Sequence, residues 1–363
     1  MDFHALGRQA TALHQQGRLA EAEALYRQIL GHDPRVFPAL YLLGMLRLQQ
    51  GDSGEAVDLL DRALALNPND PAALMHYGLA LHGQGRFAEA AATFDRLVAA
   101  HPGEPAALIG RGAALKALGR DAAALVDYES VLVADPRNPD AYYNQAALLH
   151  KQGLQNRDSV ALAQAESLYN TCLLYDRNHV DCHRGLAVLL TETGRTQQAF
   201  TLLTKWASDN PQSADARVEL ARLSEEIGDQ RNAQAYLVEA LRLDGGNWRA
   251  HAALGRQREL EGKYAEAIQN YQRAQSYNPY QPQLVAKIQE LSSRVAQSSL
   301  PSTNASASSG AFNRGPTAAG TPSAAPATGW NWTNQPGPPN IIANPSTALG
   351  TRNATAPNPN IRY

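Results

Sequence analysis

The residues whose types could bind a metal or form a disulfide are two cysteines and ten histidines, and the histidines are scattered along the chain. The chain has only two cysteines, Cys172 and Cys182, and two cysteines are too few for a disulfide framework. We interpret both as reduced thiols in the core, with a disulfide or redox pair as the alternative. His179 and His183 have the i, i+4 spacing of a helical metal site. Because His179 precedes the predicted helix, we expect no metal there.

No sequence pattern supports catalysis. The chain lacks a nucleophile elbow, an HExxH motif, a phosphate-binding loop and a CxxC pair. Residues 83–88 match G-x-G-x-x-A, but no predicted strand precedes them, and a dinucleotide site requires one. We interpret the adjacent carboxylates Glu225 and Glu226 as a solvent-exposed face. The sequence therefore predicts a protein that is not an enzyme and has no cofactor.

Small residues recur with a period of 34 residues over most of the chain. Glycines that mark a turn in each unit are Gly17, Gly51, Gly85, Gly119, Gly153, Gly194, Gly228 and Gly262. An alanine follows five residues later in seven of these eight units, and in the fifth unit Ala165 arrives seven residues late. Such a period is typical of a stacked helical solenoid.

The third unit shows how one repeat is built. Apolar residues at three- and four-residue spacing predict helices over 72–83 and 88–100. Gly85 lies between them, where a left-handed residue ends a helix without strain. Small residues at Gly78 and Ala90 allow the two helices to approach closely. Pro102 ends the second helix.

This pattern resembles the tetratricopeptide repeat (TPR), whose small residues and turn glycine recur here unit by unit. The second-helix position is aromatic or leucine in every unit, and the terminal proline is present except in the fifth and seventh units, where Arg177 and Gly245 replace it. The resemblance covers residues 3–281. It implies an all-α, right-handed superhelical solenoid of about 16 repeat helices. It also implies a concave groove lined by the first helix of each unit. Such a surface usually binds other molecules.

Two further segments follow the predicted repeats. Residues 282–296 form an amphipathic capping helix that covers the last unit. Residues 297–363 are a low-complexity tail rich in Ala, Pro, Ser and Asn, which we expect to be disordered alone. The tail holds a tryptophan- and isoleucine-containing patch that is either a docking motif or an accidental cluster: Trp330, Trp332, Ile341 and Ile342.

The fifth unit contains seven extra residues, at about 154–160. Insertions in repeats often map to a binding face, so a wider turn between the helices is one interpretation. The alternative is a longer helix, with Asp158 or Ser159 as the next N-cap.

Composition limits the partners. A net charge of −2 argues against nucleic acid, which needs a basic stripe. No stretch approaches the ~20 apolar residues of a membrane span, so we expect no membrane insertion. The first residues lack the apolar run of a signal peptide, which favours a cytoplasmic location. Arginine far outnumbers lysine, which points to a GC-rich bacterial gene.

The groove predicted for units two to five is apolar and contains methionine, whereas that of units six to eight is charged. Exposed apolar patches mark interaction sites, and methionine adapts to varied ligands. The alternative is that tight curvature buries these residues between units. The candidate binding residues are Tyr41, Leu42, Met45, Met75, His76, Leu79, Ile109, Tyr143 and Asn144.

Three functions fit these features. The first is a scaffold or adaptor that binds a peptide or helix in the groove. The second is self-association, in which the tail patch occupies the same groove in its own or a neighbouring chain. The third is an accessory subunit of an enzyme or of a secretion or polysaccharide-export complex.

Overall fold

The computed structural model describes residues 3–278 and 281–298, and this part contains seventeen α-helices and no strand. Sixteen helices form eight consecutive pairs: α1 (Phe3–Gln15), α2 (Leu19–His32), α3 (Phe37–Gln49), α4 (Ser53–Leu66), α5 (Pro71–Gly83), α6 (Phe87–Ala100), α7 (Pro105–Ala117), α8 (Asp121–Ala134), α9 (Pro139–Asn156), α10 (Ser159–Tyr175), α11 (Val180–Glu192), α12 (Thr196–Asp209), α13 (Ala214–Glu226), α14 (Gln230–Leu243), α15 (Trp248–Leu260) and α16 (Tyr264–Tyr277). The last helix is α17 (Pro282–Ser298). The predicted all-α solenoid is confirmed.

The predicted turn glycines are confirmed in seven of the eight units. Their φ angles lie between 73° and 83°, a left-handed conformation that glycine adopts without a Cβ clash. Gly153 is the exception, because it lies inside α9. The left-handed residue of this unit is Arg157, with φ 54°. Gly153 was therefore wrongly predicted as a turn residue.

The seven extra residues of the fifth unit lengthen the helices on both sides of the turn. Helix α9 has 18 residues, whereas α7 has 13. The Asp158 carboxylate caps α10 by accepting hydrogen bonds from the backbone N–H of Val160 at 2.9 Å and of Ala161 at 3.2 Å. The expectation of a wider turn is wrong, and the longer helix with an Asp158 cap is confirmed.

Close helix contact depends on glycine where an aromatic ring lies between helices. A Cβ on Gly78 would lie 2.7 Å from the Phe94 ring, and a Cβ on Gly110 would also lie 2.7 Å from it. The ring is therefore held between α5 and α7, and Phe94 is fully buried. The role predicted for Gly78 is confirmed.

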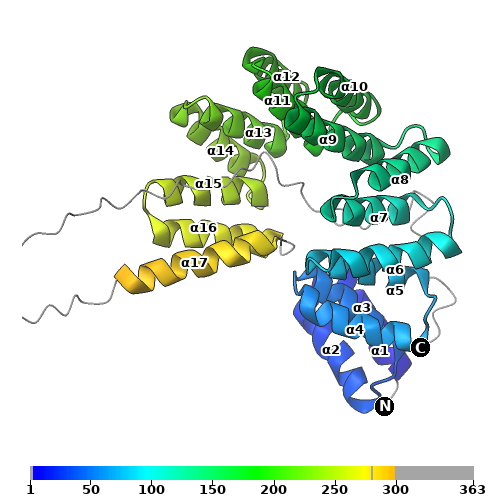
Figure 1. Ribbon diagram of the computed structural model, residues 1–363. Helices are drawn as coiled ribbons and strands as arrows, with labels where there is room; N and C mark the ends of the chain where they lie inside the picture. The colour runs from blue at the N-terminus through cyan, green and yellow to red at the C-terminus, as the bar shows by residue number, and fades with distance from the viewer. Residues whose placement is uncertain (1–2, 279–280, 299–363) are drawn as a thin grey trace, which may run out of the picture.

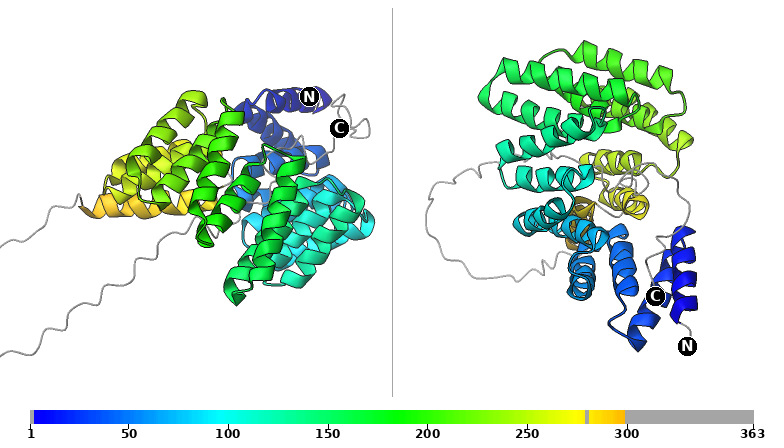
Figure 2. Two further views of the ribbon diagram at one scale, coloured as in Figure 1. Left: turned by 90° about the horizontal axis from the view of Figure 1, so that it is seen from above. Right: turned by 90° about the vertical axis from the view of Figure 1, so that its right-hand side faces the viewer.

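The helices form two layers along an arc (Figures 1 and 2). Each odd-numbered helix from α1 to α13 contacts the next odd-numbered helix as well as its own pair mate. These first helices of the units form the inner layer, and the even-numbered helices form the outer layer. Helix α17 packs against α16 and buries Leu284 and Leu291.

None of the described helices has both the length and the apolar composition needed to cross a bilayer. The tail patch that contains Trp330, Trp332, Ile341 and Ile342 lies outside the described residues.

Candidate functional site

The inner face of α3 and α5 carries six of the predicted binding residues. Five are half-buried and therefore offer part of their surface to solvent: Tyr41, Leu42, Met45, Met75 and His76. Leu79 is only 5% exposed. The apolar surface in these units is thus formed mainly by the two methionines and Leu42.

Three further predicted residues lie on α7 and α9. Ile109 and Asn144 are 4% and 3% exposed, and Tyr143 is half-buried. The Asn144 side-chain amide donates to the carbonyl of Asp140 at 2.8 Å. Burial between neighbouring units, the alternative to an open binding surface, therefore applies to Leu79, Ile109 and Asn144.

Aromatic contacts hold the N-terminal part of this face. The Tyr41 ring stacks on Phe37 with centroids 6.1 Å apart and meets the edge of His76 at 5.6 Å. The His76 Nδ1–H donates to the carbonyl of Ala72 at 2.8 Å. Burial lowers the pKa of His76, so the imidazole is neutral at pH 7. The charged group that acts on both rings is the Asp70 carboxylate, at the N-cap of α5.

One lysine lies close to His82, in the last turn of α5. Lys116 on α7 is half-buried and, within the described residues, forms no ion pair. Burial and the nearby Lys151 lower the pKa of Lys116 to about 8, against an opposing effect of Asp121. A ligand carboxylate would stabilise the charged form of Lys116.

The inner face of units six and seven is already neutralised by internal ion pairs. Glu219 accepts from Arg184 at 2.6 Å and from Arg222 at 2.9 Å, and only 1% of its side chain is exposed. Burial alone would raise the pKa of Glu219, but the two guanidinium groups lower it to about 2. The carboxylate is therefore ionised at any physiological pH.

The ion pairs continue into unit eight. Arg249 lies 3.7 Å from Asp181 and 3.5 Å from Asp215. Glu225 pairs with Arg256 and has a side-chain exposure of 9%. The interpretation of Glu225 as a solvent-exposed carboxylate is wrong, because the neighbouring inner helix covers it. Sequence reasoning identified these charges but missed their pairing.

The spacing of these charged residues in the sequence could have predicted their pairing. Arg184 and Glu219 are 35 residues apart, and Asp215 and Arg249 are 34 apart. Side chains one period apart occupy equivalent slots on adjacent inner helices. Opposite charges at this spacing are therefore neighbours in space.

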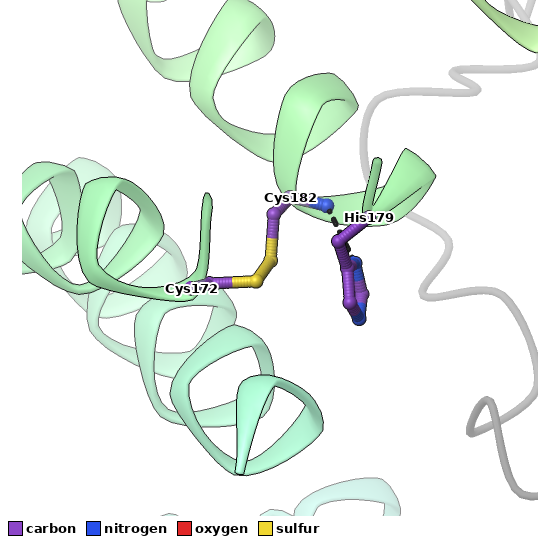
Figure 3. Close-up of side chains that lie close together, drawn as sticks. All are labelled: Cys172, His179 and Cys182. Carbon is purple, nitrogen blue, oxygen red and sulfur yellow. Dashed lines mark hydrogen bonds between the residues drawn. A yellow bond between two sulfur atoms is a disulfide. The ribbon is translucent and has the colours of Figure 1, made fainter. Parts of the chain in front are cut away.

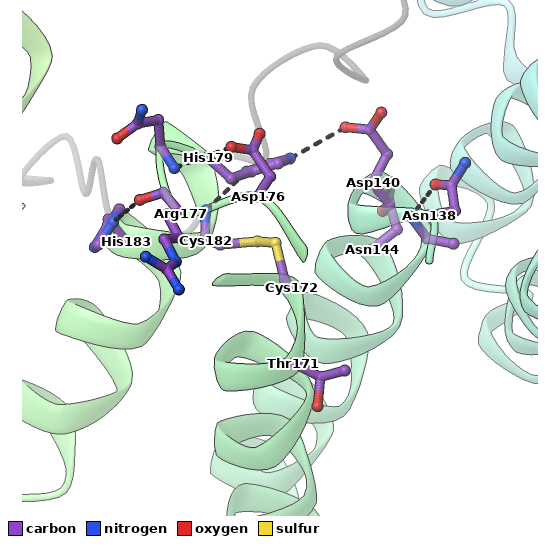
Figure 4. Close-up of a disulfide and its surroundings, with 12 residues drawn as sticks. Asn138, Asp140, Asn144, Thr171, Cys172, Asp176, Arg177, His179, Cys182 and His183 are labelled. Atoms are coloured by element: carbon purple, nitrogen blue, oxygen red, sulfur yellow. Dashed lines mark hydrogen bonds and ion pairs between the residues drawn. A yellow bond between two sulfur atoms is a disulfide. The ribbon is translucent and has the colours of Figure 1, made fainter. Parts of the chain in front are cut away.

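The two cysteines form a disulfide, and the expectation of free thiols is wrong. Cys172 lies in the last turn of α10 and Cys182 in the first turn of α11, with Cα atoms 6.5 Å apart (Figure 4). The chain reverses between these turns, so both side chains point into one junction. The sequence separation of ten residues does not reveal this contact.

Two histidines flank the disulfide but face different partners. His179 caps α11, with its Nδ1 accepting from the backbone N–H of Cys182 at 3.2 Å. The His183 ring stacks on Trp206 at 4.0 Å and donates from Nε2 to the carbonyl of Arg177 at 3.0 Å. The i, i+4 spacing therefore does not bring the two rings to a common point.

Family models of the tetratricopeptide repeat match residues 1–36, 41–105, 83–139 and 214–247. The chain contains tetratricopeptide repeats. The helix pairs between residues 139 and 209 and between residues 248 and 277 continue the same series. The TPR fold is that of a protein-interaction scaffold, and it does not identify a partner.

Three solved structures are similar to this chain at low sequence identity. A tetratricopeptide repeat protein from Parabacteroides merdae is 20% identical, with coverage of 71% of this chain and 99% of its own and a TM-score of 0.47. PilW, described as a type IV pilus biogenesis factor, is 19% identical over 60% of this chain and 98% of its own, with a TM-score of 0.50. The human IFIT1 dimer with m7Gppp-AAAA is 17% identical over 76% of this chain and 72% of its own, with a TM-score of 0.50. No curated protein matches the chain.

Proposed function

We propose that this TPR protein is a non-enzymatic scaffold that binds an apolar protein segment on the inner face of α3, α5, α7 and α9. The supporting observation is the contrast between the two halves of that face. In units six to eight the inner charges are paired with one another. In units two and three, half-buried apolar side chains keep part of their surface in water.

The chemistry of the face indicates what the segment would carry. Leu42, Met45 and Met75 suit an amphipathic helix or an extended peptide with apolar anchors. Lys116 on α7 suits a carboxylate on the same segment. Arginine- or lysine-rich segments fit less well, because the side chains that form this surface are apolar, aromatic or basic.

Substitution of the two methionines tests the binding face. Peptides selected from a displayed library on the full chain should lose at least about tenfold in affinity when Met45→Glu and Met75→Glu are combined, a loss of about 1.4 kcal/mol or more. Val133→Glu is the control, because Val133 is 84% exposed on the outer helix α8. Unchanged affinity of the methionine variant, with helical circular dichroism intact, would refute the proposed face.

The tail patch is a candidate occupant of the same face. We propose that the segment from Trp330 to Ile342 binds there in its own or a neighbouring chain, because tethering raises the local concentration to roughly millimolar. The full chain with Trp330→Ala and Trp332→Ala should then show faster hydrogen exchange in α3 and α5. Equal exchange in the two proteins would exclude tail docking.

The disulfide bears on the compartment in which the protein works. Disulfides persist in oxidising compartments and are rare in the cytoplasm, so this bond favours an oxidising location over the cytoplasmic one. It also supports the alternative function of an accessory subunit of an export complex. Acid quenching of cells followed by thiol alkylation tests the location, since an oxidised pair stays unlabelled. Co-purification without any export component would count against the accessory-subunit function.

A further inference from the structure

The junction between units five and six contains a group of side chains with metal-ligand chemistry. One ligand atom from each of Cys172, His179 and Cys182 lies within 4.8 Å of the other two, and all three residues are buried (Figure 3). They come from one short stretch in which α10 ends, the chain turns and α11 begins. The local backbone therefore brings them together without any contribution from distant repeats.

The imidazole of His179 is already oriented for a role between the cysteines and a carboxylate. Its Nδ1 lies on the side of Cys182, whose backbone N–H it accepts at 3.2 Å. Its Nε2 lies 3.2 Å from Oδ1 of Asp140 on α9. Metal-bound histidines usually donate their second ring nitrogen to a carboxylate or carbonyl in this way. Figure 4 shows the contact between His179 and Asp140, with the disulfide next to this histidine.

The donor set selects a class of metal. Two thiolates and one imidazole are soft ligands that suit Cu⁺ and Zn²⁺. Structural Zn²⁺ sites nearly always have four ligands, and the group found among the described residues has three. A three-ligand, buried site with two sulfur atoms fits Cu⁺ best. Two thiolates and Cu⁺ leave a charge of −1 at the N-terminus of α11, where the helix dipole favours negative charge.

We propose that reduction of the Cys172–Cys182 disulfide converts this junction into a Cu⁺ site with Cys172, Cys182 and His179 as ligands. A dithiol reductant supplies two electrons and two protons to the S–S bond and leaves as its own disulfide. When Cu⁺ binds, each cysteine thiol releases its proton, and the Nδ1 lone pair of His179 exchanges its hydrogen bond from the backbone N–H of Cys182 for the metal. The disulfide joins units five and six in the oxidised chain, and the metal joins them in the reduced chain.

The proposal is tested on the full chain by copper competition. The protein is reduced with dithiothreitol without oxygen, desalted, and titrated with Cu⁺ held by the coloured chelator bicinchoninate. One equivalent of Cu⁺ should leave the chelator for the reduced chain, and none should leave it for the oxidised chain. Copper bound elsewhere is measured with the variant that combines Cys172→Ser and Cys182→Ser.

A histidine pair provides the matched control. His179→Asn removes the imidazole but supplies asparagine, which is among the most favourable N-cap residues. Helix α11 should therefore remain folded. Removal of an outer partner of a metal site costs roughly 10- to 100-fold in affinity, and this variant should lose more copper affinity than that. His183→Asn, one helical turn away, should bind copper like the unchanged chain.

Two results would overturn the proposal. The first is equal copper uptake by the reduced chain and by the double cysteine variant. The second is equal loss of affinity in His179→Asn and His183→Asn when circular dichroism shows both variants folded. Either result would leave the cysteine pair as a disulfide only.

Discussion

Arg184 on α11 and Glu219 on α13 form an ion pair at 2.6 Å that links units six and seven, with only 1% of the Glu219 side chain exposed. Glu219 also accepts from Arg222 at 2.9 Å on its own helix. A carboxylate buried between two guanidinium groups stabilises the folded state only while it is ionised.

This relationship predicts the acid sensitivity of the C-terminal units. The folded-state pKa of Glu219, about 2, lies below its unfolded value. Its contribution is therefore fully present above about pH 4.5 and is lost as the pH falls towards 2. The difference between the folded and unfolded pKa of Glu219 corresponds to roughly 3 kcal/mol in the free energy of unfolding. Urea unfolding at pH 6 and pH 3 should show a smaller acid-induced loss for Glu219→Gln than for the unchanged chain. Identical losses would contradict the buried pairing.

The contact between Gly78 and Phe94 predicts a large effect from one methyl group. A Cβ at Gly78 would lie 2.7 Å from the ring, and the ring cannot shift freely because it also lies close to Gly110. Gly78→Ala should therefore destabilise the chain by about 1–3 kcal/mol. A Cβ added at Gly31 in α2 would meet nothing within 4 Å, so Gly31→Ala should be neutral or stabilising by up to about 1 kcal/mol. Thermal unfolding of both variants distinguishes crowding from a general effect of replacing glycine.

Arg157 predicts a stabilising substitution. Its φ of 54° costs a non-glycine residue about 1 kcal/mol. Arg157→Gly should raise the free energy of unfolding by about that amount, whereas Arg157→Val should lower it, because a β-branched residue is least tolerant of this conformation. If both variants lower stability equally in urea unfolding, the left-handed turn at this position is wrong.

The repeat period predicted most of the fold because each unit repeats the same local chemistry. Gly85 and its equivalents identify the turns, and Gly78 identifies a close helix contact. Gly153 was wrongly predicted as a turn residue because it lies one period after the turn glycine of the preceding unit. The extra residues that move the turn to Arg157 come after Gly153 in the sequence. Local pattern cannot show which of two candidate residues takes the left-handed conformation.

The candidate site was harder to predict because burial depends on curvature. The first-helix positions in units two to five were assigned to the inner face, but a single sequence does not reveal how closely adjacent units pack. Leu79 and Ile109 are covered, whereas Met45 and Met75 remain half-buried. The disulfide was missed for a related reason: its contact depends on the path of the turn between α10 and α11.

The disulfide predicts a local rather than a global response to reduction. It closes a loop of only about ten residues, for which chain entropy predicts about 2–3 kcal/mol of stabilisation. Because repeat units contact only their neighbours, Cys172→Ala combined with Cys182→Ala should accelerate hydrogen exchange in α10 and α11 and leave α3 and α5 unchanged. Uniform acceleration along the chain would show that the array unfolds as one unit.

A ligand that binds the apolar half of the inner face should leave the ion-paired half free. Hydrogen exchange of the full chain with and without a saturating library-selected peptide measures this division directly. We expect slower exchange in α3, α5 and α7 and unchanged exchange in α13 and α15. Protection confined to α13 and α15, or to the outer helices, would contradict binding on the apolar half.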